Sequence, residues 1–178
     1  NFDLIDHKLY ISTSDGHVSR MELRPRSVAQ FYRDLMSKLG ELDIDIKIYT
    51  VPSEVADGIP FDEDETHASY DAEQANAFFR VLSFADTTFK KFRARFIGKC
   101  SPVHFFWGGF DLAVTRFSGR TAPEHPAGVP HMPDWVAREA YSHEVSSLGF
   151  WPGGEQFPHA VFYSYAYPEP EGFRGARV

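Results

Sequence analysis

Two pairs of side chains in this sequence have the chemistry of acid–base groups. His104 and Asp111 lie in the most aromatic stretch of the chain, and His143 and Glu144 are adjacent in a second apolar run. An imidazole changes charge near neutral pH, and a carboxylate is rarely buried without a partner. We therefore take these four residues as candidate catalytic groups. We expect His104, His143 and one carboxylate to converge on one concave pocket.

Asp111 stands among apolar residues and needs a cation or a hydrogen-bond donor. Arg116, Arg120 and His104 are the nearby candidates in the sequence. One interpretation is a site that uses the charge of the carboxylate. The other is a structural ion pair, or exposure of the acid at the end of a strand.

A metal site is a weaker hypothesis. His143 and Glu144 fall in a predicted strand, where adjacent side chains point to opposite faces, so they lack the helical spacing of a zinc protease. A site of two histidines and a carboxylate would need His67 to join His104 or His143 through the fold. The sequence indicates no particular metal or cofactor.

Cys100 is the only cysteine, which excludes an internal disulfide and any zinc site built from several cysteines. It follows Lys99, and a nearby cation lowers the pKa of a thiol and favours a nucleophile. The alternative is a small buried apolar residue, which is the commoner role of a lone cysteine.

The elements around the first pair alternate in polarity, as strands do. Residues 103–107 and 110–115 flank Gly108-Gly109, a pair that suits a tight hairpin turn. A hairpin would place His104 and Asp111 on the same face. One long strand bent at the glycines would place them on opposite faces, and the pattern leaves both arrangements open.

Two helices are predicted. Ser27 is a favourable N-cap for a helix over residues 27–39, where apolar residues recur at helical spacing. Asp71 and Gln74 resemble a capping box that starts a longer helix over 71–96, with a row of phenylalanines and a basic end. That basic end is either a solvated helix terminus or an anion site.

The remaining segments read as strands and loops. Strands are expected near residues 2–11, 18–23, 44–48, 141–150 and 160–167. Loops are expected at 52–66, which carries the acidic run 62–65, and at 118–135, which is rich in Pro and Gly. We interpret the acidic run as a solvated loop.

These elements predict an α+β fold in which two helices cover an antiparallel sheet. A chain of 178 residues suits one domain, residues 1–178. It starts in strand pattern at Asn1 without a methionine, so we expect an N-terminal part of the full protein to be missing.

Composition limits the function. The net charge of -7 argues against a nucleic-acid partner, because phosphate neutralisation needs excess cations. No apolar run reaches the roughly 20 residues that span a bilayer, so we expect no membrane partner and a cytoplasmic location. The aromatic content of 16% favours a core or pocket built from rings.

Long motifs carry a resemblance to a known family. The stretches FIGKCSPVHFFWGGFDLAVTRFSGR, FDEDETHASYD, EAYSHEVSS and YAYPEPEGF resemble a bacterial family of domains of unknown function. The resemblance implies no catalytic or binding residue. It also implies that this chain is the second half of an internally duplicated helix-plus-sheet unit.

Our preferred function is a small-molecule enzyme or ligand-binding protein with an aromatic pocket. His104, Asp111, His143 and Glu144 would supply its polar groups. The alternative is a non-catalytic interaction or structural module whose aromatic residues form the core. The oligomeric state and the identity of the small-molecule partner do not follow from the sequence.

Overall fold

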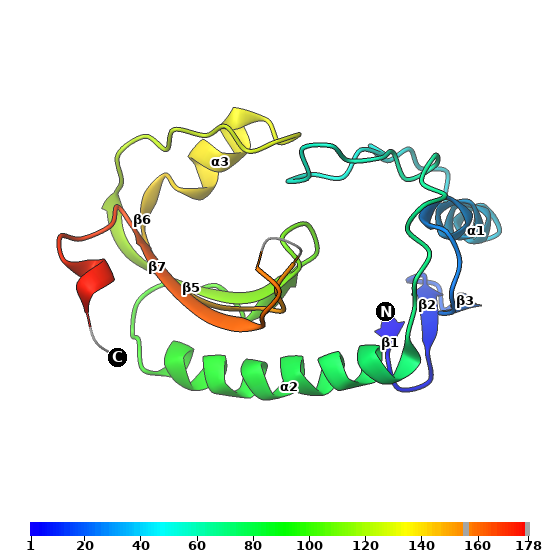
Figure 1. The fold of residues 1–178 in the computed structure, drawn as a ribbon, viewed down its shortest axis with the longest axis horizontal. Coiled ribbons are helices and arrows are strands. Elements are labelled where there is room, and N and C mark those ends of the chain that lie inside the picture. Colours follow the sequence, from blue (N-terminus) through cyan, green and yellow to red (C-terminus); the bar gives the residue numbers. More distant parts are fainter. Residues whose placement is uncertain (155–156, 177–178) are drawn as a thin grey trace. The chain divides into compact units, whose positions relative to one another are not determined.

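The structure is a computed structural model that describes residues 1–154 and 157–176. The chain divides into two compact units. We call Asn1–Arg80 the N-terminal unit and Val81–Val178 the C-terminal unit. The fold is α+β, with helices and antiparallel sheets (Figure 1).

The N-terminal unit starts with a three-stranded antiparallel sheet of order β1-β2-β3. Its strands are β1 (Phe2–Asp3), β2 (Lys8–Ser12) and β3 (Val18–Glu22). Helix α1 (Val28–Gly40) follows, and the Ser27 hydroxyl accepts a bond from the backbone N–H of Gln30, as predicted. This N-cap satisfies one of the helix N–H groups that lack an intrahelical acceptor.

The strand predicted at residues 44–48 is wrong. Residues 45–50 contain no regular structure, and Ile46 and Ile48 are exposed. The backbone N–H of Ile44 instead donates to Leu39 at the end of α1. Alternating polarity favours a strand only where a neighbouring strand offers backbone hydrogen-bond partners. Within the described residues, the sheet of this unit consists of β1, β2 and β3, and none of them pairs with residues 44–48.

Helix α2 (Ala72–Ala94) begins in the N-terminal unit and continues into the C-terminal unit. Asp71 accepts a bond from the N–H of Gln74, as the capping pattern predicts. In the C-terminal unit, the Phe89 side chain is 1% exposed and its ring contacts Phe162 at a centroid distance of 6.1 Å. The C-terminal part of α2 therefore packs against the sheet of this unit.

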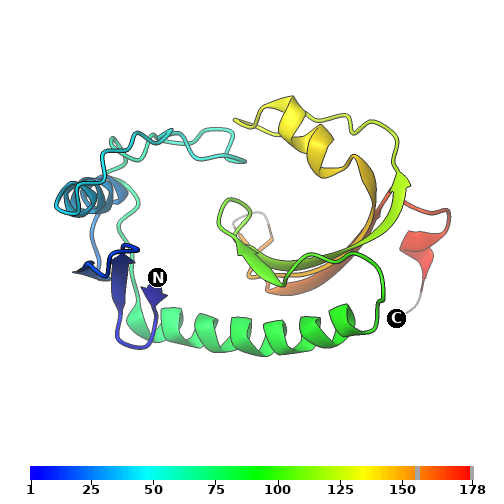
Figure 2. The same cartoon turned by 180° about the vertical axis from the view of Figure 1, so that it is seen from behind.

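The C-terminal unit contains a four-stranded antiparallel sheet of order β4-β5-β6-β7. The strands are β4 (His104–Phe106), β5 (Asp111–Thr121), β6 (His143–Trp151) and β7 (Val161–Tyr167). The sheet is curved and α2 lies on its convex side, as Figure 2 shows from behind. Buried Leu112, Val114 and Phe150 belong to the core of this unit.

The hairpin interpretation of Gly108-Gly109 is confirmed, because β4 pairs with β5 through Phe106↔Asp111 and His104↔Ala113. His104 and Asp111 therefore lie on the same sheet face. A positive φ in the turn is found at Phe110, where φ is 56°.

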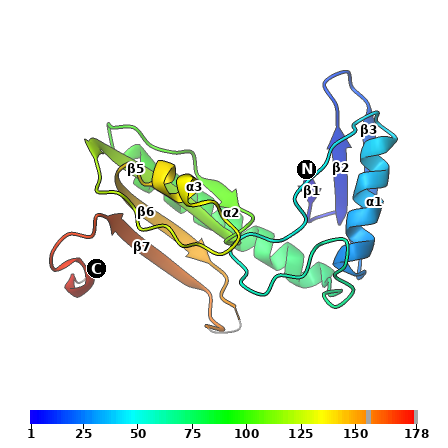
Figure 3. The ribbon, with the colours of Figure 1, turned by 90° about the horizontal axis from the view of Figure 1, so that it is seen from above.

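The predicted loop over 118–135 is partly wrong. Strand β5 runs to Thr121, which pairs with His143 across an irregular stretch. The loop ends at α3 (Asp134–Ala140), which lies on the opposite side of the sheet from α2 (Figure 3). A short 3-10 helix, Phe173–Gly175, follows β7. No helix among the described residues is long and apolar enough to cross a membrane.

Candidate functional site

The irregular stretch of β5 is the feature that builds the candidate site. Phe117 pairs with Val145 and Thr121 pairs with His143, so the β5 segment between them is longer than its β6 counterpart. Gly119 has a φ of 84°, the left-handed conformation that glycine adopts without strain. We call Ser118, Gly119 and Arg120 the β5 bulge.

The β5 bulge folds around the carboxylate of Glu144. The Ser118 hydroxyl donates to Glu144 at 2.8 Å, and a guanidinium nitrogen of Arg120 lies 2.6 Å from the same carboxylate. The backbone N–H of Arg120 donates to the Ser118 oxygen at 3.0 Å. The bonds from Arg120, first, and from Ser118 lower the pKa of Glu144, because they favour its ionised form.

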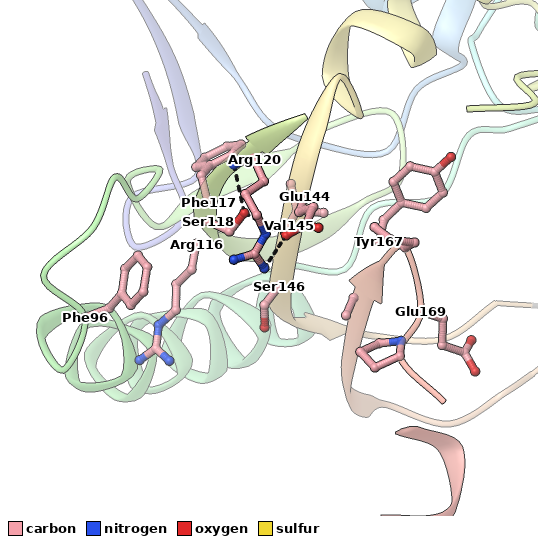
Figure 4. Close-up of a pocket in the computed structure, with 13 residues that line it drawn as sticks. Phe96, Arg116, Phe117, Ser118, Arg120, Glu144, Val145, Ser146, Tyr167 and Glu169 are labelled. Atoms are coloured by element: carbon pink, nitrogen blue, oxygen red, sulfur yellow. Dashed lines mark hydrogen bonds and ion pairs between the residues drawn. The ribbon is translucent and has the colours of Figure 1, made fainter. Parts of the chain in front are cut away.

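A cavity of about 480 Å³ lies beside the β5 bulge in the C-terminal unit. Figure 4 shows Phe96 and Arg116 on one side, Arg120 and Glu144 in the middle, and Glu169 on the other side. The remaining lining residues are Phe117, Ser118, Val145, Ser146, Ala166, Tyr167, Pro168 and Pro170. The lining thus combines apolar walls with a few charged and hydroxyl groups, as ligand cavities commonly do.

Arg116 is the unusual group in this lining. Its guanidinium carbon lies 3.4 Å from the centroid of the Phe92 ring and 5.4 Å from that of Phe96. A terminal nitrogen donates to the Phe92 carbonyl near the end of α2, where the helix dipole favours a cation. The Nε atom is buried and has no hydrogen-bond partner among the described residues.

The two carboxylates that line the cavity each pair with an arginine, but one cavity arginine has no such partner among the described residues. Glu144 pairs with Arg120, and Glu169 pairs with Arg174 at 2.9 Å. Arg116, by contrast, forms no ion pair with a carboxylate in the part of the chain that the structure describes. Among the described residues, Arg116 is therefore the cation of this cavity that pairs with no carboxylate.

Sequence reasoning missed this role of Arg116, which it considered only as a partner for Asp111. The alternation of side chains along β5 indicates on which face of the sheet Arg116 lies. Arg116 shares the parity of Leu112 and Val114 in β5, whereas Asp111 has the opposite parity, so the two side chains leave the sheet on opposite faces.

Asp111 has a different partner. It accepts a hydrogen bond from the Tyr163 hydroxyl of β7. Burial, and then this bond and the charge of Asp111, raise the pKa of Tyr163 above its ordinary value of 10.0. The phenol thus stays protonated as the donor of the pair, and Asp111 stays its acceptor.

The expected convergence of His104 and His143 is wrong. His104 pairs with Ala113 near the start of β5, and His143 pairs with Thr121 at its end. An antiparallel strand rises about 3.4 Å per residue, so the two histidines lie on the order of 25 Å apart. The sheet therefore brings His104 near Asp111 and leaves His143 beside Glu144.

His143 lines an adjacent cavity of about 650 Å³ on the other side of the β5 bulge. Its Nδ1 lies 3.1 Å from the Ser142 hydroxyl, and Lys99 and Glu139 supply charges to the same cavity. Of the four predicted residues, only Glu144 lines the cavity that contains Arg116.

An aromatic cluster lies next to the face of the sheet that carries His104 and Asp111. Tyr163 and Tyr165 stack with centroids 6.2 Å apart. Tyr141 lies against His125 at 4.5 Å, and its hydroxyl is 3.2 Å from that of Tyr165. These rings form a polar aromatic surface.

No group of three His, Cys, Asp or Glu residues within the described ranges is arranged to hold a metal ion. Cys100 is a free, partly buried thiol whose backbone forms an isolated bridge with Arg116.

A family model described as a family of unknown function (DUF5996) matches residues 1–178, so the chain belongs to that family. Neither the comparison with curated proteins nor that with solved structures gave a match.

Proposed function

We propose that the C-terminal unit binds a small organic anion with an apolar body in the cavity beside the β5 bulge. The observation that carries this proposal is Arg116, a cavity-lining cation without a carboxylate partner among the described residues. A carboxylate or similar oxyanion would supply the missing negative charge.

The energetics of Arg116 favour an acceptor. A buried donor that is left unsatisfied costs about 1–3 kcal/mol, and more where the group is charged. The Nε–H of Arg116 is such a donor within the described residues. An arginine stacked on an aromatic ring is also held in one orientation, so it loses little entropy when it binds a planar carboxylate.

The rest of the lining suits the apolar body of such a ligand. Phe96, Val145 and Ala166 contribute apolar surface, and the Ser146 side chain is small. The cavity of about 480 Å³ lies within the usual range of ligand pockets, roughly 300–1,000 Å³. We therefore propose a ligand with one negative charge and an apolar body about the size of one aromatic ring.

Thermal unfolding with a small ligand panel tests the proposal. Phenylacetate should raise the melting temperature in proportion to its occupancy, whereas phenylacetamide, which has the same ring and no charge, should not. Ser146→Leu would fill part of the cavity without removing Arg116, and it should abolish the shift. Equal shifts with both ligands would contradict the proposal.

A further inference from the structure

A second cavity, of about 380 Å³, lies in the N-terminal unit. It is lined by Leu23, Arg24, Arg26, Val28, Phe31, Thr66, His67, Ala68, Ser69 and Tyr70. Two arginines, a histidine and a tyrosine thus line one open space, in which the His67 side chain is 71% exposed. None of these residues belongs to the site described above.

Asp64 lies in the acidic run that the sequence indicates to be a solvated loop, but its side chain is buried. The whole residue is 6% exposed. Its Oδ1 accepts bonds from the backbone N–H groups of Thr66 and His67, both at 3.0 Å. These backbone bonds, that of His67 first, lower the pKa of Asp64, so the carboxylate is ionised at neutral pH.

The first turn of α1 fixes this segment in place. The backbone N–H of Ala29 donates to the Asp64 carbonyl at 2.9 Å, and that of Val28 donates to the His67 carbonyl at 3.0 Å. The first two N–H groups of the helix therefore bond to the loop backbone, whereas that of Gln30 bonds to the Ser27 hydroxyl. Asp64 and His67 keep a defined separation as a result.

Asp64 orients the His67 ring. The Oδ2 atom of Asp64 lies 2.8 Å from Nδ1 of His67, which makes Nδ1 the donor of the pair. The other ring nitrogen, Nε2, has no protein partner among the described residues. A carboxylate that holds one imidazole nitrogen leaves the second with a fixed tautomer and direction.

Arg26 provides a second and independent indication of a ligand. Its side chain is 9% exposed and pairs with Asp34 at 2.5 Å. Its buried Nε has no hydrogen-bond partner among the described residues. Arg24 also lines the cavity and forms no ion pair within the described ranges, so its guanidinium is available to a ligand.

We propose that this cavity binds the phosphate group of a small molecule, with His67 Nε2 and the two arginines as its contacts. Phosphate supplies several strong acceptor oxygens, which match the guanidinium donors of Arg24, a cation without a carboxylate partner among the described residues. Arg26, which Asp34 holds in place, adds a second cation to the lining. Because Nδ1 donates to Asp64, Nε2 of the neutral imidazole is an acceptor, and a hydroxyl of the phosphate group would donate a hydrogen bond to it.

Nuclear magnetic resonance of the histidine side chains in the intact chain tests this site. Inorganic phosphate and phenyl phosphate serve as probes for a free anion and for an ester. The resonance that disappears in His67→Gln should shift saturably with at least one of them. In Arg24→Gln, affinity for that probe should fall by about tenfold or more, as expected for loss of a charge-assisted contact.

His17 offers a matched control, because its Nδ1 lies 3.0 Å from Asp15 in an exposed pair that lines none of the described cavities. His17→Gln should bind the probe as wild type does. Asp64→Asn should weaken binding if the carboxylate positions the imidazole. The proposal is overturned if neither probe shifts His67 saturably, or if Arg24→Gln binds as tightly as His17→Gln.

Discussion

At the scale of single residues, two arginines indicate where anions bind. Arg26 and Arg116 each have a buried Nε without a partner among the described residues, and each lines a cavity. A folded chain seldom leaves a buried donor unsatisfied. We therefore interpret the two arginines as the cations beside which an anion binds in each cavity.

The contact between Gly149 and Tyr163 gives a prediction about stability. A Cβ atom at Gly149 would lie 2.0 Å from Cζ of the Tyr163 ring, which is far closer than van der Waals contact. Gly149→Ala should therefore displace Tyr163 from Asp111 and destabilise the fold by about 1–3 kcal/mol. Chemical denaturation would measure this loss.

Gly40 is the control for that substitution, because a Cβ there would meet nothing within 4 Å. Gly40→Ala should leave stability unchanged or raise it by up to about 1 kcal/mol. Equal stability of Gly149→Ala and wild type would show that Tyr163 moves aside without cost, contrary to our account.

The residue types alone predict some of these side-chain contacts but not others. The requirement for a partner at Asp111 was correct in principle, but the partner is Tyr163, which only strand pairing brings near. The role of Glu144 depends on the β5 bulge, and no local pattern indicates that Ser118 and Arg120 turn towards it. Tertiary contacts decide these details.

At the scale of elements, the bonds around Glu144 predict a dependence of stability on pH. The pKa of Glu144 lies below its ordinary value of 4.5 in the folded chain. The ionised carboxylate therefore stabilises the fold at pH values above 4.5, the ordinary pKa of the group. This stabilisation is lost as the pH falls through the lower pKa of Glu144 in the folded chain. Between about pH 5 and about pH 3, the melting temperature of Glu144→Gln should fall less than that of wild type.

Glu139→Gln is a suitable control, because Glu139 is exposed and has no ion pair within the described ranges. Its melting temperature should follow that of wild type across the same pH interval. If Glu144→Gln also follows wild type, the bonds from Arg120 and Ser118 do not stabilise the carboxylate.

Helix α2 offers a comparison of two phenylalanines. Phe89 is 1% exposed, whereas Phe84 on the same helix is 71% exposed. Phe89→Ala should cost about 3–5 kcal/mol through lost burial and the cavity that remains. Phe84→Ala should change stability by no more than about 0.5 kcal/mol. Similar losses for the two variants, measured by denaturant unfolding, would contradict the packing described here.

Helix positions were predictable because capping and apolar spacing are local properties. Ser27 and Asp71 cap their helices as the pattern indicates. The segment 44–48 has the alternation of a strand but not the structure, since a strand depends on a partner elsewhere in the chain. Its exposed isoleucines show that polarity pattern and pairing are separate requirements.

At the scale of the whole molecule, each compact unit carries a cavity with its own charged groups. Membership of a family of unknown function assigns no activity to either cavity. The duplicated origin and the interaction-module alternative stay predictions. The α+β class, by contrast, followed from the order of helical and strand patterns.

The central claim is that Arg116 binds the charged group of an organic anion. Isothermal titration of phenylacetate and phenylacetamide into wild type and Arg116→Gln tests it most directly. Arg95→Gln is the matched control, because Arg95 is an exposed cation that does not line the cavity. It measures any general effect of losing one positive charge.

We predict that Arg116→Gln weakens phenylacetate binding by about 1.5–3 kcal/mol relative to wild type, as expected for a charged hydrogen bond. Phenylacetamide should bind weakly to both proteins, and Arg95→Gln should bind phenylacetate as wild type does. The same phenylacetate affinity in wild type and Arg116→Gln, or an equal loss in Arg95→Gln, would contradict the claim.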